Sequence, residues 1–356
     1  MKLGLGLYRH MLTADNFRFA RQAGATHLVV HLVDYFRGGA HRTRDDQPVG
    51  TDLGWGLAGD PDRLWTEEEL VSLRKSVEAE GLVLEAIENI DPAHWHDVLL
   101  DGPQRAKHIG NVKTLIRRMG AAGIPILGYN FSIAGVAGRT TGNYARGGAP
   151  SVGMEGPYDK PMPQGMAWNM IVSEQIGPDN LPAITHQELW RRLEAFLAEV
   201  LPVAEEAGVK LAAHPDDPPT PFVRGQPRLV YQPAMYQKLI DLNRSPANTL
   251  EFCIGSLAEM TEGDVYDAVD TYSEQGRLGY VHFRNVTGKV PYYKETFIDD
   301  GDIDMLRVLS ILKRNRYDGV LIPDHTPQMS CAAPWHAGMA YAMGFMRAAM
   351  RSLSIG

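Results

Sequence analysis

The stretch Val209-Lys-Leu-Ala-Ala-His214 ends an apolar, strand-like run on a histidine, which is a potential metal ligand. Three later stretches repeat this arrangement at intervals of roughly 30 to 40 residues, the length of one βα unit. They are Thr249-Leu-Glu-Phe-Cys253, Gly279-Tyr-Val-His282 and Gly319-Val-Leu-Ile-Pro-Asp324. Neighbouring parallel strands present their carboxyl ends at the same face of a barrel. Four such endings in succession therefore predict a barrel and a metal site together.

The rest of the chain continues this alternation of apolar, strand-like runs with amphipathic helical segments. Strands are predicted at residues 3–8, 26–32, 82–87, 124–130, 209–214, 249–254, 279–283 and 319–323. Helices are predicted at residues 64–80, 105–122, 185–207, 302–315 and 335–353, with a further helix that opens at Ser256. Two of them begin with capping patterns, Thr66-Glu-Glu-Glu69 and Thr185-His-Gln-Glu188.

Eight strands that alternate with helices predict an α/β fold, a (β/α)8 barrel that spans residues 1–356 as a single domain. An open, doubly wound sheet is the alternative arrangement. A dinucleotide-binding sheet of that kind carries a G-x-G-x-x-G turn after its first strand. Here Gly4-Leu-Gly6 lies inside the first predicted strand, so the barrel is favoured.

Two long segments interrupt the alternation, at about residues 34–62 after the second predicted strand and 131–181 after the fourth. Both leave from the C-terminal ends of strands, where barrel enzymes carry their active-site loops. The second segment contains Tyr144, Tyr158, Trp168 and Asn169 among many Gly and Pro residues. We therefore expect an ordered lid or a subunit contact, and with it a homo-oligomer such as a dimer or tetramer.

Composition and charge limit the class of protein. Hydrophobic residues make up 44% of the chain and charged residues 22%, and the net charge of −8 argues against a general nucleic-acid binder. Only two cysteines occur, Cys253 and Cys331, which argues against a disulfide framework. The N-terminal apolar run is too short for a signal peptide and no run is long enough for a membrane span, so we expect a cytoplasmic protein.

The side chains of His214, Cys253, His282 and Asp324 offer two imidazoles, one thiolate and one carboxylate. This set suits a divalent ion such as zinc, iron(II), manganese(II) or cobalt(II). Each residue alone has an ordinary explanation, because a cysteine at a strand end is often a small buried hydrophobic side chain. The shared position of all four at the ends of successive strands favours the metal site.

Residues beside the predicted ligands suggest further roles. In the proline-rich turn after His214, Asp216 or Asp217 is expected either to orient a ligand histidine or to cap the turn. Arg284 lies two residues beyond His282 and therefore on the same strand face. There it suits a substrate carboxylate, unless it forms a salt bridge to a helix instead.

Two further groups carry acid–base chemistry. His325 follows Asp324 directly, and the ordinary pKa of histidine suits a proton-transfer role. Glu88 lies just beyond the third predicted strand and shares the parity of Leu84 and Ala86. There it is expected either to bind a sugar hydroxyl or to form a salt bridge, for example with Arg284.

Eight segments form a recognisable series along the chain. They are Gly81-Leu-Val-Leu-Glu-Ala-Ile-Glu-Asn89, Gly128-Tyr-Asn-Phe131, Gly138-Arg-Thr140, His214-Pro-Asp-Asp-Pro-Pro219, Cys253-Ile-Gly-Ser256, His282-Phe-Arg-Asn285, Asp300-Gly-Asp-Ile-Asp-Met305 and Pro323-Asp-His325. The series resembles the motifs of the mannonate dehydratases, which are metal-dependent barrels related in fold to xylose isomerase. The similarity covers most of the chain, from about Gly24 to Met346.

The resemblance implies that His214, Cys253, His282 and Asp324 hold manganese(II) or iron(II), and that His325 works in acid–base catalysis. It also implies conversion of D-mannonate to 2-dehydro-3-deoxy-D-gluconate and water. A proton leaves the carbon next to the carboxylate, which the metal makes more acidic, and hydroxide leaves the following carbon. We expect Arg284 to join catalysis. The expected substrate contacts are Glu88, Asn130, Arg139, Arg284 and Asn285.

Two features depart from the family pattern. The segment between His325 and Trp335 is short and lacks the tyrosine that the family carries there, and Tyr341 comes only within the last predicted helix. The loop after the fourth strand is replaced by a Gly-rich insert. An alternative function is therefore a metal-dependent sugar isomerase or epimerase on the same barrel. A further alternative is a non-catalytic sugar-binding barrel with a structural metal.

Overall fold

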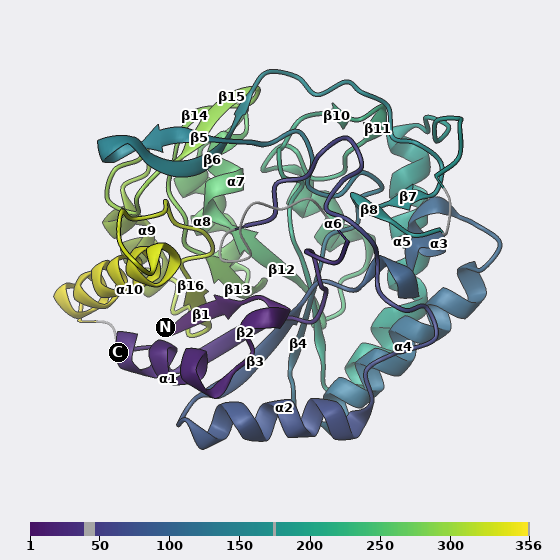
Figure 1. The fold of residues 1–356 in the computed structure, drawn as a ribbon. Helices are drawn as coiled ribbons and strands as arrows, with labels where there is room; N and C mark the ends of the chain where they lie inside the picture. The colour runs from purple at the N-terminus through teal and green to yellow at the C-terminus, as the bar shows by residue number, and fades with distance from the viewer. Residues whose placement is uncertain (39–46, 174–175, 355–356) are drawn as a thin grey trace.

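The computed structural model describes residues 1–38, 47–173 and 176–354, and its centre is a closed barrel of parallel strands (Figure 1). In ring order the strands are β1 (Lys2–Leu7), β2 (His27–His31), β3 (Val83–Glu88), β4 (Ile126–Tyr129), β9 (Lys210–Ala213), β12 (Asn248–Cys253), β13 (Leu278–His282) and β16 (Val320–Ile322). Each predicted strand overlaps one of these. The barrel prediction is therefore confirmed, and the open sheet is excluded by the pairing of β1 with β16.

Helices surround the barrel (Figure 1). They are α1 (Ala14–Ala23), α2 (Glu67–Ala79), α3 (His96–Leu100), α4 (Arg105–Ala121), α5 (His186–Ala207), α6 (Met235–Leu242), α7 (Ile254–Glu259), α8 (Val265–Glu274), α9 (Met305–Arg314) and α10 (Pro334–Ser352), with the 3-10 turns η1 (Arg9–Met11), η2 (Pro92–His94) and η3 (Arg146–Gly148). The predicted capping box of Thr66 and Glu69 opens α2, and Thr185 caps α5. Sequence periodicity had not indicated α1, α6 or α8. None of the described helices is long and apolar enough to cross a membrane.

The interior of the barrel is filled by inward-facing side chains of several strands. Val29, Ala86, Ile126, Ala212, Tyr280, Val320 and Ile322 form this cluster. Glu251 of β12 joins it as a fully buried carboxylate. A Cβ atom at Gly128 would collide with the Tyr280 hydroxyl and the Glu251 carboxylate, so the glycine makes room for both. The interior of the barrel is therefore mostly apolar, and it becomes polar directly beneath the C-terminal ends of the strands.

A second sheet joins two loops that are distant in the sequence. Its antiparallel order is β14 (Val286–Lys289), β15 (Tyr292–Glu295), β6 (Ala149–Glu155) and β5 (Thr140–Ala145), to one side of the barrel in Figure 1. Two short hairpins, β7 (Met166–Ala167) with β8 (Met170–Ile171) and β10 (Phe222–Val223) with β11 (Gln226–Pro227), complete the loops. The insert at 131–181 thus contains the paired strands β5, β6, β7 and β8. Parts of the two predicted inserts, residues 39–46 and 174–175, lie outside the described residues.

Candidate metal centre

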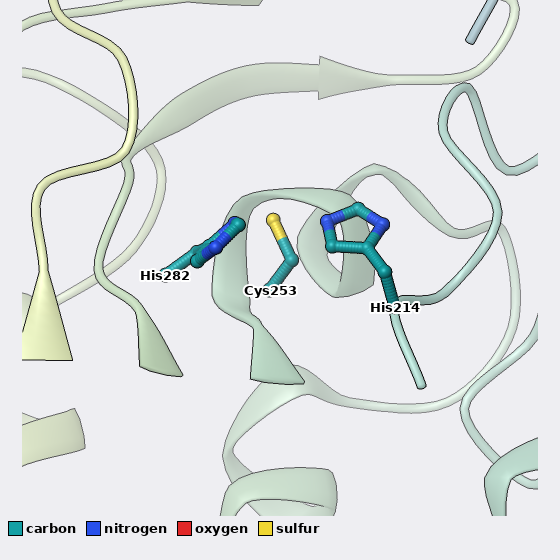
Figure 2. A group of neighbouring side chains, drawn as sticks. All are labelled: His214, Cys253 and His282. Carbon is teal, nitrogen blue, oxygen red and sulfur yellow. The ribbon is translucent and has the colours of Figure 1, made fainter. Parts of the chain in front are cut away.

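Three of the predicted ligands meet at the C-terminal end of the barrel. Cys253 ends β12 and pairs in register with His282 at the end of β13, while His214 directly follows β9. One ligand atom from each lies within 4.8 Å of the others, and Figure 2 shows the sulfur between the two imidazole rings. These side chains therefore converge as the strand-end pattern predicts.

Asp324, the fourth predicted ligand, lies beside this group. Its Oδ2 atom is 3.5 Å from Nδ1 of His282. The backbone of Asp324 has a φ of 62°, in the left-handed region that a non-glycine residue enters at a cost of about 1–3 kcal/mol. Such a conformation persists only where its surroundings hold it. The turn after β16 therefore fixes the direction of this carboxylate.

The unshared electron pairs of the two histidines fit a cation. Nδ1 of His214 is 2.6 Å from the Pro215 carbonyl, which only accepts hydrogen bonds, so Nδ1 carries the hydrogen and Nε2 keeps a lone pair. Nε2 of His282 lies 3.3 Å from both Glu88 and Glu251, and its buried Nδ1 has no hydrogen-bond partner among the described residues. Two such nitrogens with a thiolate and a carboxylate suit a divalent transition metal.

The surroundings favour the charged forms of both anionic ligands. Burial raises the pKa of the Cys253 thiol, but the Arg284 guanidinium and the two histidines outweigh it and hold that pKa well below its usual range. Burial likewise raises the pKa of Asp324, and His325 and His282 overcome that effect and lower it. Cys253 also caps α7, because its sulfur accepts the backbone N–H of Ser256 at 3.5 Å, and it accepts the Ser256 hydroxyl at 3.2 Å as well.

Beneath the ligands, Glu88 and Glu251 form a second acidic layer around His282. Burial, reinforced by Glu88, raises the pKa of Glu251 well above that of an ordinary carboxyl. Glu88 is also buried, but His31 and His282 lower its pKa to about 2. One carboxylate of the pair is therefore charged and the other protonated. Glu251 had escaped the sequence analysis, although its position two residues before Cys253 places it on the same strand face.

His325 lies between two carboxylates. Its Nε2 is 3.3 Å from Oδ1 of Asp324, and its Nδ1 is 3.3 Å from Oε1 of Glu295. Burial lowers the pKa of His325, but Asp324 and Glu295 reverse this and raise it. Glu295 belongs to β15 of the second sheet, so no strand-end pattern in the barrel could have revealed it.

Arg284 is fully engaged by protein groups. Its guanidinium contacts the carboxylates of Asp217 at 3.3 Å, Glu259 at 3.4 Å and Asp324 at 3.4 Å. It also hydrogen-bonds Glu295 and donates to the Ser256 hydroxyl. The side chain is 1% exposed and is absent from the described lining of the site cavity. Arg284 therefore contacts the candidate ligands Cys253 and Asp324 without lining the described cavity. We had expected its guanidinium to face the substrate.

The cavity above the ligands has polar and aromatic walls. The described residues that line it are Tyr8, His31, Tyr35, Pro48, Trp55, Glu88, Asn89, Asn130, Val136, Arg139, Trp168, His214, Asp217, Glu251, His282, Asp324 and His325. Of the five predicted substrate contacts, Glu88, Asn130 and Arg139 are among them. Nη1 of Arg139 is buried without a hydrogen bond in the described part of the chain. The same nitrogen lies 3.7 Å from Asp217 and 3.5 Å from Glu295, so the guanidinium stands at the cavity wall in ion pairs without a close hydrogen bond.

The remaining predicted contacts have structural partners. Asn285 donates to the carbonyls of Ile298 and Ile303 and accepts the Ile303 amide, so it holds the loop before α9. Asn130 donates to the Pro215 carbonyl and accepts the indole N–H of Trp168. The structure thus occupies much of the hydrogen-bonding capacity of both amides.

Asp216 and Asp217 act on different parts of the site. Asp216 pairs with Arg228 at 2.8 Å and accepts the amides of Leu229 and Val230, which is a loop-capping role. Asp217 lies against Arg284 and accepts the Tyr293 hydroxyl at 3.3 Å. The group that orients His214 is the Pro215 carbonyl, so neither aspartate makes the histidine contact that we had considered.

A second group of ligand-type side chains lies between α3 and α4, formed by His96, Asp97 and His108. Nδ1 of His108 accepts the backbone N–H of Asp97 at 3.0 Å. The hydrogen of the neutral ring must then be on Nε2, which leaves that nitrogen without a lone pair for a cation. This group is therefore a buried hydrogen-bond network, and the strand-end group is the better metal centre.

Comparisons with known proteins identify the family of this chain. The family model for D-mannonate dehydratase (UxuA) matches residues 21–348. The mannonate dehydratase of Streptococcus suis is 33% identical over 290 residues, which are 73% of this chain and 74% of that protein. Mannonate dehydratase 2 of Halalkalibacterium halodurans is 29% identical over 275 residues, which are 74% of this chain and 79% of that protein.

Solved structures give the same result. The crystal structure of mannonate dehydratase from Streptococcus suis serotype 2 has a TM-score of 0.74 at 26% identity and covers 100% of this chain and 95% of its own. A structure of L-ribulose 3-epimerase has a TM-score of 0.57 at 14% identity, with 99% and 95% covered, and shares the fold alone. Because the family model spans all four ligand-bearing strand ends, this chain belongs to the mannonate dehydratase family.

Proposed function

We propose that this protein removes water from D-mannonate to give 2-dehydro-3-deoxy-D-gluconate. The observation that carries the proposal is the position of His325, which lies against Asp324 and lines the same cavity as His214 and His282. A proton-transfer group therefore stands beside the candidate metal ligands. This arrangement supports a catalytic site more strongly than a structural metal site.

We assign the cation as manganese(II) or iron(II), held by His214, Cys253, His282 and Asp324. When bound, such a cation would make the hydrogen beside the substrate carboxylate more acidic. The unpartnered buried Nδ1 of His282, the turning of Nδ1 of His214 to the Pro215 carbonyl, and the lowered pKa values of Cys253 and Asp324 support this ligand set. The same donor atoms suit either metal, so the availability of each metal in the cell decides which one is bound.

The chain's own residues supply the rest of the chemistry. His325 takes the proton from the carbon next to the carboxylate, and Glu295 and Asp324 orient its ring from opposite sides. Arg139 lines the cavity, and its Nη1 makes no hydrogen bond among the described residues, so its guanidinium suits the substrate carboxylate. Trp55 and Trp168, whose rings lie 5.3 Å apart, form an apolar wall for the carbon chain.

The direct test is a product assay with the purified, metal-loaded protein. Incubation with D-mannonate and a panel of other aldonic acids, followed by nuclear magnetic resonance, should show a 2-keto-3-deoxy acid from D-mannonate. A panel of ketoses in parallel examines the isomerase or epimerase alternative, which shares the first proton removal. Absence of a keto-deoxy product from every aldonic acid, with isomerised ketose present, would refute the dehydratase proposal.

We also propose that the protein is a homo-oligomer, a dimer or tetramer, which works in the cytoplasm. The exposed side chains of Tyr292 and Leu306, at 65% and 44% of their surface, support a covered face in solution. Light scattering coupled to gel filtration measures the mass directly. A monomeric mass across micromolar concentrations would contradict the oligomer.

A further inference from the structure

His31 lines the cavity and has had no role in the account so far. It ends β2, shares strand parity with the inward-facing Val29, and has a side chain that is 13% exposed. In the ring order of the eight strands, β2 stands opposite β12, which carries Cys253. His31 therefore faces the candidate metal ligands from the far wall of the barrel mouth.

Neighbouring residues fix the direction of the His31 ring. The Tyr35 hydroxyl lies 3.0 Å from Nδ1, and Asn89 donates its amide N–H to the same hydroxyl at 3.0 Å. The ring is also flanked by Tyr8, with centroids 5.1 Å apart, and by the edge of Tyr35 at 5.4 Å. Such a fixed imidazole is prepared for directional chemistry.

The other nitrogen of His31 is turned toward the cavity. Nε2 is 3.6 Å from Oε1 of Glu88, which is longer than a hydrogen bond. A ligand hydroxyl can therefore approach Nε2. Burial lowers the pKa of His31, and the nearby Glu88 carboxylate opposes that effect. Glu88 itself touches His282 at 3.3 Å across the barrel. The His31–Glu88 pair thus reaches the same space as the metal ligands.

The proposed reaction needs two proton transfers at neighbouring carbon atoms. His325, beyond β16, is adjacent to the ligand Asp324 and serves the carbon next to the carboxylate. Among the described residues of the cavity, His31 is the remaining histidine that is not a candidate ligand. Two acid–base groups on different walls suit a reaction in which one takes a proton while the other gives one.

We propose that His31 is the proton donor to the departing hydroxyl group, an assignment that rests on the proposed dehydration. The C2–H bond breaks and its proton passes to His325, while the electron pair is held first as an enolate of the substrate carboxylate and then forms the C2–C3 double bond as hydroxide leaves C3. The C3–O bond breaks, and the oxygen takes the proton of His31 Nε2 and leaves as water. The enol then gains a proton at C3 from solvent and loses the proton of its C2 hydroxyl to solvent, which gives the ketone. Solvent returns a proton to His31 and removes one from His325.

This assignment predicts how the intermediate divides between return to substrate and formation of product. The division can be measured with the full-length, metal-loaded enzyme and D-mannonate in deuterium oxide. Without its proton donor, the intermediate should return to substrate and carry deuterium at C2. For His31→Gln we expect the ratio of C2 exchange to product formation to rise at least about 100-fold, the usual contribution of a general acid. Nuclear magnetic resonance reads both quantities in one sample. A ratio within about threefold of the wild type would overturn the assignment.

Matched variants separate this result from general damage. His27→Gln removes a histidine from the other end of β2. His27 lies 3.7 Å from Glu85 and is not among the described residues that line the cavity, so this variant should leave the ratio unchanged. Tyr35→Phe removes only the hydroxyl that orients His31 and should raise the ratio about tenfold, which gives a second measurement if His31→Gln does not fold. If neither variant raises the ratio, His31 is not the donor.

The wild-type arm tests the proposed function separately. A wild type that forms product while His31→Gln forms it at the same rate overturns the role of His31 alone. A wild type that forms no product from any aldonic acid overturns the dehydration and the role of His31 with it. If His31→Gln retains the metal but loses both C2 exchange and product formation, His31 acts in removal of the C2 proton, before the C–O bond breaks. That result would also contradict the proposal.

Discussion

The Glu295 carboxylate lies 3.3 Å from Nδ1 of His325, although one residue belongs to the second sheet and the other to the turn after β16. The hairpin of β14 and β15, in which Glu295 lies opposite Val286, brings Glu295 to this place. The same carboxylate hydrogen-bonds Arg284, which in turn contacts Cys253 at 3.5 Å. One side chain of the second sheet therefore links the candidate base to the candidate metal ligands.

This contact predicts the behaviour of Glu295→Gln. The amide keeps the size of the side chain but loses the negative charge that favours a protonated His325. We expect kcat to fall about 100-fold, with little change in KM, because the change affects proton transfer more than binding. Steady-state kinetics with D-mannonate measures both constants. Unchanged kcat at full metal content would show that Glu295 does not assist His325.

The barrel and its ligands could be predicted because they follow local rules. Strand ends recur once per βα unit, and side-chain parity then decides which residue faces inward, as for His282 and Cys253. His31 obeys the same rule, since its apolar run also ends on a histidine, and the signal was overlooked. These predictions required only the periodicity of one strand at a time.

The rest of the site depends on contacts between distant segments. Glu295 ends the β14–β15 hairpin and contacts His325 in the turn after β16, and no pattern local to either segment encodes that contact. Arg284 has the predicted parity, yet acidic groups from four separate segments surround its guanidinium. A Cβ at Gly255 would press against this guanidinium, so α7 packs closely on it. These contacts of Arg284 depend on tertiary packing, which the spacing of residues in the sequence does not predict.

Cys253→Ser should separate the metal role of this residue from its capping role. A serine hydroxyl is a better helix N-cap than a thiol, so α7 and the fold should be retained. The hydroxyl is a poor substitute for a thiolate ligand, and we expect metal affinity to fall at least about tenfold. Titration against a fluorescent chelator measures the affinity, and circular dichroism checks the fold. Wild-type affinity in this variant would remove Cys253 from the ligand set.

His108 predicts how stability changes with acid. Burial lowers the pKa of His108 to about 4, below its ordinary value of 6.5, so the folded state prefers the neutral ring. Its contribution to stability is complete above pH 6.5 and is lost as the pH falls toward 4. Protonation also removes the acceptor for the Asp97 amide.

The matched variant for this effect is His108→Gln. Its amide oxygen can accept the same N–H but does not titrate. The thermal midpoint of the wild type should therefore fall more steeply between neutral and mildly acidic pH than that of the variant. Parallel slopes in a thermal-melt series would contradict the buried neutral histidine.

Arg139 provides the sharpest test of substrate binding. Its guanidinium is 5% exposed, lies 3.5 Å from Glu295 and 3.7 Å from Asp217, and keeps Nη1 without a hydrogen bond in the described part of the chain. A charge-assisted contact to a substrate carboxylate is worth about 1.5–3 kcal/mol, so Arg139→Gln should lower kcat/KM roughly 10- to 150-fold. Most of the loss should be in KM, because the carboxylate is bound equally before and during the reaction.

Controls for Arg139 come from the same part of the chain. Arg146→Gln changes an exposed arginine of the 131–181 insert, which pairs with Asp299 at 3.3 Å, and should leave KM unchanged. Arg139→Lys should recover only part of the loss, because an ammonium cannot make the two parallel bonds of a guanidinium. The decisive comparison uses D-mannonate and the corresponding neutral amide. If Arg139→Gln weakens both substrates equally, the guanidinium does not bind the carboxylate and acts only through Asp217 and Glu295.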